Sequence, residues 1–175
     1  TVTGAGSAIL SKTGNGPYIT HITSGKIVDM GIKDANNMGA AMAPAALDTL
    51  ICHFNDTGRS PNYYDAIITG DLGHIGKDIL LELSADKGYN IKNNYNDCGL
   101  MIYGSDIKIY CGGSGCACLP TVSYSYIYTM MKLNKYKKVL LCATGALMNP
   151  IMTLQAESIP AICHIVEWEV ENDFS

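Results

Sequence analysis

Residues 111–120 read CGGSGCACLP, and the rest of the chain can be laid out around this stretch. Three of the four residues at 112–115 are glycine, which permits positive φ angles and a close approach of the backbone to a bound group. The run 106–110 predicts a strand that enters the loop, and residues 121–133 predict a helix that leaves it. Free N–H groups of the loop and the dipole of the helix favour an anionic or carbonyl-bearing ligand, although a tight turn needed only for packing gives the same pattern.

The composition restricts the class of protein. The chain has 175 residues, of which 47% are hydrophobic, so residues 1–175 can form one domain with a buried core. A net charge of −4 argues against nucleic acid as the main partner, and no apolar run is long enough to span a bilayer. The seven cysteines lack the spacing of a secreted disulfide framework, which favours reduced thiols in a reducing compartment. Because the chain has neither an initiator Met nor a signal peptide, we expect a piece of a longer protein.

Alternating strand and helix patterns predict an α/β domain with a mostly parallel sheet. The expected strands are short and apolar or alternating: residues 1–13, 64–69, 138–143 and 161–170, with a hairpin over 18–30. The expected helices carry apolar residues at helical spacing: residues 38–55, 75–86 and 121–133. Residues 89–97 are typical of a polar surface connection and 144–146 of a turn, whereas 98–103 are apolar but too short to be assigned as a helix or a strand.

Three of the predicted loops follow strands, at residues 69–73, 111–118 and 142–146. In sheets of this kind, ligands bind beyond the carboxyl ends of the strands. We therefore expect the three loops to converge on one binding site.

Six stretches carry a resemblance to a known family. They read GKIVDMGIKDANNMGAAMAPAA (25–46), TGDLGHIGKDIL (69–80), YNDCG (95–99), GGSGC (112–116), ATGAL (143–147) and SIPAICH (158–164). On these residues the chain resembles the C-terminal half of the stage V sporulation protein AD family, within the thiolase and ketoacyl-synthase superfamily. The resemblance implies a thiolase-like half with a five-stranded mixed, mostly parallel sheet, helices on both faces, and an active-site region shared with the protein's own N-terminal half.

The same resemblance implies a role in endospore formation. Members of the family bind dipicolinic acid, with or without its calcium, and take part in moving it into the forespore together with other proteins of the same operon. This places the chain at the periphery of the inner spore membrane, without a membrane span of its own. A fragment without its N-terminal half is expected to expose an apolar face and to pair with itself as a homodimer.

Departures from the thiolase pattern argue against an enzyme. Leu119 stands where thiolases have a histidine before the proline, and leucine can neither transfer a proton nor donate a hydrogen bond. Cys142 takes the place of the second thiolase cysteine, but without a histidine partner we expect it to be a packed strand residue. We therefore expect no catalytic residue. The alternatives are an acyl-transfer enzyme that uses Cys142 or a cysteine of the N-terminal half, and an assembly scaffold without a ligand.

Dipicolinate is a flat ring with two carboxylates, so its pocket should offer N–H donors, a hydroxyl and a cation. His21 is a candidate for the cation, although a strand histidine more often serves packing. Asp71 suits a ligand that brings calcium, and otherwise caps the helix that follows. The expected ligand-binding residues are His21, Asp71, Gly112, Gly113, Ser114, Gly115 and Cys142.

Three cysteines of the central loop, Cys111, Cys116 and Cys118, are candidate ligands for a soft metal ion. No second Cys or His pair follows at zinc-finger spacing, so packing at the loop–helix junction is the favoured interpretation. We expect no metal site formed by the protein alone, and no cofactor other than calcium carried with dipicolinate.

Overall fold

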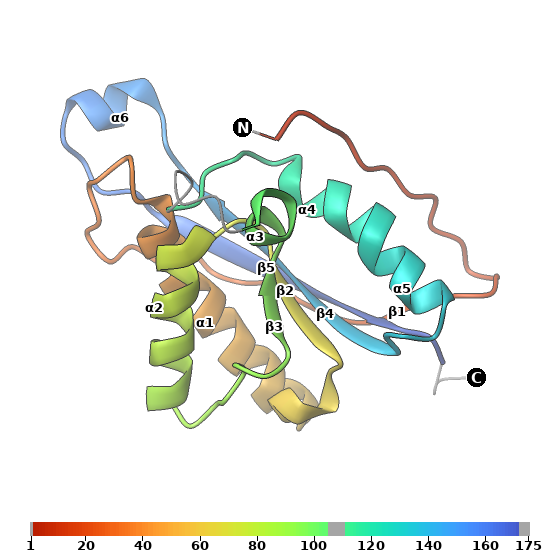
Figure 1. Cartoon of the computed structure of the whole chain (residues 1–175). Coiled ribbons are helices and arrows are strands. Elements are labelled where there is room, and N and C mark those ends of the chain that lie inside the picture. Colours follow the sequence, from red (N-terminus) through yellow and green to blue (C-terminus); the bar gives the residue numbers. More distant parts are fainter. Residues whose placement is uncertain (1, 105–110, 172–175) are drawn as a thin grey trace.

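The computed structural model describes residues 2–104 and 111–171, which form one five-stranded sheet with helices on both faces (Figure 1). The strand order is β1-β5-β4-β2-β3. The strands span Tyr18–Thr23 (β1), Ala66–Thr69 (β2), Tyr95–Asp97 (β3), Lys138–Ala146 (β4) and Ala161–Glu169 (β5). β2 pairs in parallel with β3 and β4, whereas β5 runs antiparallel to both β4 and β1. Only β5 therefore opposes the common direction, and the expected mixed, mostly parallel sheet is confirmed.

Helices α1 (Met38–Thr57) and α2 (Gly73–Asp86) cover one face of the sheet (Figure 1). Asn37 caps α1 by accepting a hydrogen bond from the backbone N–H of Ala40, and Gly58 ends the helix with a φ of 66°. The predicted stripe of α1 is buried in the core: Met42, Ala46, Leu50 and Phe54. Pro44 lies inside the helix and not in its first turn.

The other face is covered by α3 (Cys98–Tyr103) and by a continuous helical segment that follows the central loop. This segment comprises α4 (Cys118–Val122), a π-helical stretch (Ser123–Ile127) and α5 (Tyr128–Lys132). The sheet has a hydrophobic core on each face, because successive side chains of a strand point to opposite faces. Ile67 and Leu140 belong to the core on the α1 side, whereas Ile68 and Leu141 belong to the core on the α4–α5 side.

Two predictions for the N-terminal region are wrong. The segment 2–17 runs along α4 and α5 without regular structure (Figure 1). It forms no strand because its small polar residues do not alternate strictly enough with apolar ones to bury one face. The predicted hairpin over 18–30 is absent. Its first half is β1, and beyond β1 the chain continues along β5 as far as an isolated bridge from Val28 to Ala161, without folding back.

Further differences concern the end of β4 and three short elements that the sequence did not predict. The expected turn at 144–146 is a continuation of β4, which pairs with β5 as far as Ala146. The polar stretch 89–97 contains β3, and 98–103 form α3. A short helix, α6 (Pro150–Leu154), lies between β4 and β5 and was not expected from the sequence. The predicted strand 106–110 lies outside the described residues.

Candidate functional site

A cavity of about 370 Å³ lies beyond the carboxyl ends of β2 and β4. Each of the three predicted loops contributes to its wall, as expected for a site at the strand ends of an α/β sheet. Helix α1 and the start of α4 complete it. The lining residues are Met38, Met42, Gly70, Asp71, Gly113, Ser114, Gly115, Cys116, Cys118, Leu119, Pro120 and the β4 residues Ala143, Thr144, Gly145 and Ala146.

The glycine loop has the backbone that its sequence predicts. Gly112, Gly113 and Gly115 have φ angles of 76°, 91° and 101°, which favour glycine. A side chain at Gly112 would collide with the backbone of the loop after β2, and a Cβ at Gly113 would lie 3.0 Å from the Sδ atom of Met38. The loop therefore packs directly against its two neighbours, and of its three glycines Gly113 and Gly115 line the cavity whereas Gly112 does not.

Asp71 connects the loop after β2 to the glycine loop. Its side chain is almost completely buried, and its Oδ2 atom accepts a hydrogen bond from the backbone N–H of Ser114 at 2.5 Å. Its Oδ1 atom has no hydrogen-bond partner among the described residues. The alternative role as a cap of α2 is not observed, because the N-cap residue is Leu72, which has no side-chain cap.

A second carboxylate, Asp97, lies behind this wall. It is fully buried at the end of β3 and accepts hydrogen bonds from Thr69 Oγ1 at 2.7 Å and from the N–H groups of Leu72 and Leu100 at 2.8 and 3.2 Å. Burial raises the pKa of Asp97, and the nearby Asp71 carboxylate raises it further. Asp97 thus connects the end of β2, the loop after it and the first turn of α3.

Gly99 separates the two carboxylates. A Cβ at this position would overlap Asp71 Oδ1 and lie 3.1 Å from Asp97 Oδ1. Sequence reasoning missed Asp97 because it stands in an Asn-rich stretch that resembles a surface loop. The signal that could have found it is the Asp–Cys–Gly order, in which Asp97 caps α3 through Leu100.

Two of the described lining residues, Ser114 and Thr144, carry hydroxyl groups, and both hydroxyl oxygens are buried. Thr144 Oγ1 has no hydrogen-bond partner within the described residues, and Ser114 Oγ lies beside the Cys118 thiol. Burial raises the pKa of Cys118 to about 11, so this thiol is protonated at neutral pH and is not an activated nucleophile.

Cys142 does not line the cavity. It is fully buried in the core on the α1 side of β4, one residue before the strand reaches the cavity. A hydrogen bond with the Cys163 thiol, together with burial, raises the pKa of Cys142 well above its ordinary value. The raised pKa keeps the Cys142 thiol protonated, in agreement with the expectation that nothing nearby activates it.

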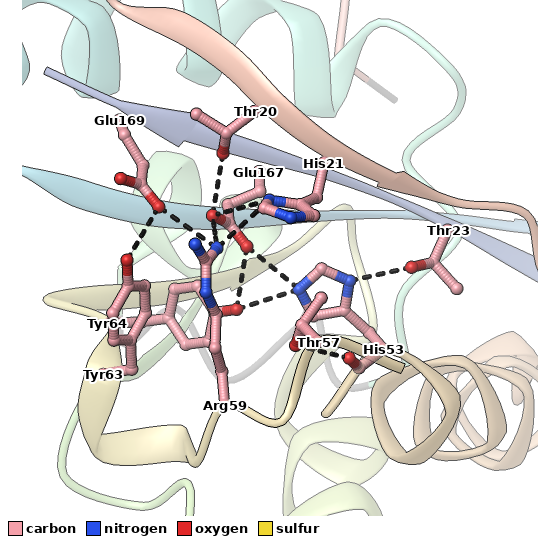
Figure 2. Close-up of polar contacts among 10 residues, drawn as sticks. All are labelled: Thr20, His21, Thr23, His53, Thr57, Arg59, Tyr63, Tyr64, Glu167 and Glu169. Atoms are coloured by element: carbon pink, nitrogen blue, oxygen red, sulfur yellow. Dashed lines mark hydrogen bonds and ion pairs between the residues drawn. The ribbon is translucent and has the colours of Figure 1, made fainter. Parts of the chain in front are cut away.

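His21 lies in β1, away from the cavity, in a polar network centred on Glu167 (Figure 2). Its Nδ1 atom is 3.4 Å from Glu167 Oε1 and 3.2 Å from Arg59 Nη1. Burial lowers the pKa of His21, and the Arg59 guanidinium lowers it further, so the ring is neutral at pH 7. Of the seven expected binding residues, the structure brings Asp71, Gly113, Ser114 and Gly115 to the cavity, with Gly112 directly behind them.

The described residues contain no group of three or more His, Cys, Asp or Glu side chains arranged to hold a metal ion. Within the same part of the chain, none of the helices combines the length and apolar character needed to cross a membrane.

Comparison with known proteins gives a consistent result. The family model described as "Stage V sporulation protein AD (SpoVAD)" matches residues 1–169. The chain is 45% identical over 169 residues to the Stage V sporulation protein AD of Bacillus subtilis (strain 168), covering 97% of this chain and 50% of that relative. It therefore spans about half the length of the curated relative. That name describes a protein of sporulation and no enzyme activity. The chain belongs to the stage V sporulation protein AD family.

Proposed function

We propose that this chain forms the ligand cavity of a non-catalytic sporulation protein that binds dipicolinic acid, with or without calcium, and takes part in its uptake into the forespore. The observation that supports this most is the convergence of two loops and the end of β4 on a cavity lined by polar groups, in which the Cys118 thiol is protonated.

The size and lining of the cavity suit a single aromatic ring with two carboxyl groups. Pockets for small organic ligands have volumes of about 300–1,000 Å³, and this cavity, at about 370 Å³, is at the lower end of that range. Met38, Met42, Leu119 and Pro120 supply apolar surface for the faces of a ring. The glycine loop and the Ser114 and Thr144 hydroxyls supply hydrogen-bonding groups for carboxylates.

Binding without chemical conversion is expected because the side chains that a thiolase-like reaction would need are replaced or displaced. Leu119 lines the cavity at the position of the thiolase histidine, and Cys142 is buried in the core below it. The buried thiol of Cys118 holds its proton. Among the described residues, the cavity therefore offers shape and hydrogen bonds, but neither the thiolase histidine nor the thiolate that such a reaction uses.

The partners belong to the same proposal. We place the protein at the periphery of the inner spore membrane, with the other products of its sporulation operon. Exposed apolar side chains in the β4–β5 connection, such as Leu147, Ile151 and Leu154, are available for an N-terminal half or a second copy of the chain.

The test is calorimetry with dipicolinate, with and without calcium, on the protein at its full natural length. Ser114→Ala should weaken binding about 5–10-fold, since it removes one hydrogen-bonding group from the cavity. Ser60→Ala is the matched control, because Ser60 is exposed and makes no side-chain cap hydrogen bond. Absence of heat and of any thermal shift would favour the scaffold. A stable acyl adduct on a cysteine after incubation with acetyl-CoA would favour the acyl-transfer enzyme.

A further inference from the structure

Residues 2–6 of the N-terminal segment pack against the glycine loop and the start of α4 (Figure 1). The backbone N–H of Val2 donates a hydrogen bond to the carbonyl oxygen of Ser114 at 2.9 Å. The Val2 side chain packs against the hydrophobic core on the α4–α5 side of the sheet. This segment therefore contacts a residue of the cavity lining, although residues 2–6 are not among the described lining residues themselves.

Two glycines allow this close packing. A Cβ at Gly6 would overlap the carbonyl oxygen of Pro120 and lie 2.7 Å from the Cδ2 atom of Tyr124. A Cβ at Gly4 would lie 2.8 Å from Thr121 Oγ1. Neither glycine has a positive φ, so both are needed for space and not for backbone conformation. A methyl group at either position would therefore push the segment away from α4.

The hydrogen bond from Val2 fixes the orientation of one peptide group in the glycine loop. The Ser114 carbonyl and the Gly115 N–H belong to the same planar trans peptide group and point in opposite directions, so the contact with Val2 also sets the direction of this N–H. Gly115 is exposed, lines the cavity and has a φ of 101°. No described heavy atom lies within 4 Å of the place that its Cβ would take, so side-chain packing does not resist rotation of the group.

The orientation of this peptide group matters for an anionic ligand. Its N–H is a hydrogen-bond donor for a carboxylate, whereas a rotated group would present a carbonyl oxygen in the place of the N–H and repel the carboxylate. The preceding peptide group is held separately, since the Ser114 N–H donates to Asp71 Oδ2 at 2.5 Å. Among the described contacts, Asp71 therefore fixes the peptide group before Ser114, and Val2 fixes the one after it.

We propose that residues 2–6 are positioning residues of the ligand site. They hold the Ser114–Gly115 peptide group in the orientation that leaves its N–H available to a carboxylate of the ligand, and they act through the loop without contacting the ligand. Docking of the segment and binding of the ligand then stabilise each other, because both favour the same conformation of the loop. This inference rests on the proposed function, since it concerns the same cavity and the same aromatic dicarboxylic acid.

The first test measures this coupling in the unmodified protein at its full natural length. Amide hydrogen exchange is followed with and without saturating dipicolinate. We expect the Val2 amide to exchange about fivefold more slowly in the complex, whereas the amide of the exposed Lys12, in the same segment, should not change. Equal exchange of the Val2 amide in both states, with binding confirmed by calorimetry, would overturn the inference and leave the proposed function intact.

The second test moves the segment. Gly6→Ala should weaken dipicolinate binding about 3–10-fold, which is the effect of losing one hydrogen bond. Ser7→Thr is the matched control, because it adds one methyl group at an exposed position of the same segment, and its affinity should change less than about twofold. An affinity of Gly6→Ala equal to that of the unmodified protein would contradict a positioning role.

The third test is a rescue. Gly4→Ala should also weaken dipicolinate binding, and adding Thr121→Ala removes the oxygen that the new methyl group would meet. Thr121→Ala alone should bind as tightly as the unmodified protein, since Thr121 is not among the described lining residues and its Oγ1 has no hydrogen-bond partner among the described residues. The double variant should regain most of the lost affinity, and a loss that Thr121→Ala does not restore would overturn the inference. Absence of dipicolinate binding by the unmodified protein, with and without calcium, would instead overturn the proposed function on which the inference rests.

Discussion

Two regions next to the sheet contain a buried carboxylate, and the two carboxylates differ in how many of their oxygens have hydrogen-bond or ion-pair partners. Glu167, on β5, is fully buried and accepts from Arg59, Thr20 and Tyr64, with His53 Nε2 at 3.1 Å (Figure 2). Asp71, at the cavity, is nearly as buried but receives one backbone hydrogen bond and has one oxygen without a described donor.

The comparison separates a fully paired carboxylate from an incompletely paired one. A buried carboxylate with a guanidinium and several hydroxyl donors is satisfied by the fold itself, and its network ties β1 and α1 to β5. Asp71 accepts one backbone hydrogen bond, and its other oxygen lies against Gly99 without a donor among the described residues. Incomplete pairing, and not burial or charge alone, therefore distinguishes the candidate site.

The largest expected effect lies in the Glu167 network. Glu167→Ala leaves the largely buried Arg59 guanidinium without its main partner, so we expect a loss of about 3–5 kcal/mol in the free energy of unfolding. Urea denaturation measures this. Glu157→Ala, at an exposed position, is the control and should change stability by less than about 0.5 kcal/mol. A loss at Glu167 as small as that of the control would contradict a structural role for the network.

The two regions should also respond to pH with opposite signs. Burial, followed by the nearby Arg59, lowers the pKa of His53 from 6.5 to about 4, so the unfolded chain binds this proton more readily than the folded one. This contribution to stability is complete above pH 6.5 and is lost as the pH falls towards 4, by about 2–3 kcal/mol. The raised pKa of Asp97 acts in the other direction, since the folded protein gains stability when this group is protonated.

Thermal unfolding between pH 7.5 and pH 4 measures the first of these contributions. His53→Gln removes the titrating ring, so its melting temperature should fall less steeply with decreasing pH than that of the unmodified protein. Asp97→Asn removes the opposing contribution, so the melting temperature of this variant should fall more steeply with decreasing pH than that of the unmodified protein. Equal slopes for the His53 variant and the unmodified protein would show that the ring carries no such linkage.

Gly99 gives a smaller but more local effect. In Gly99→Ala the new methyl group would overlap Asp71 Oδ1, which should cost about 1–3 kcal/mol of stability and displace the carboxylate from the cavity wall. Adding Asp71→Ala removes the obstructing group, so the double variant should recover part of that stability. A double-mutant cycle by urea denaturation measures the coupling, and purely additive losses would count against the close approach of these two residues.

The sequence predicted the local features of the site, but not the contacts between distant segments. The glycine loop and the α1 stripe follow from short-range conformational and periodic preferences, which a single stretch of sequence displays. The position of His21 depends on β1 pairing with β5, so that its ring meets Glu167, far along the chain. Asp97 was missed because β3 is short and surrounded by polar residues, and its burial comes from packing of α3 and the loop after β2.

The smallest expected effect concerns Cys142, which the sequence placed in the site and the structure places in the core beneath it. Cys142→Ala removes a small buried group and its thiol contact with Cys163, so we expect a loss of about 1 kcal/mol in stability. Because the side chain does not line the cavity, the affinity for dipicolinate should change less than about twofold, which is about 0.4 kcal/mol. Ser114→Ala in the same calorimetric series should instead lower affinity with little loss of stability. If Cys142→Ala abolished binding while the protein remained folded, the thiol would contribute directly to the ligand site, and its assignment to the core would be wrong.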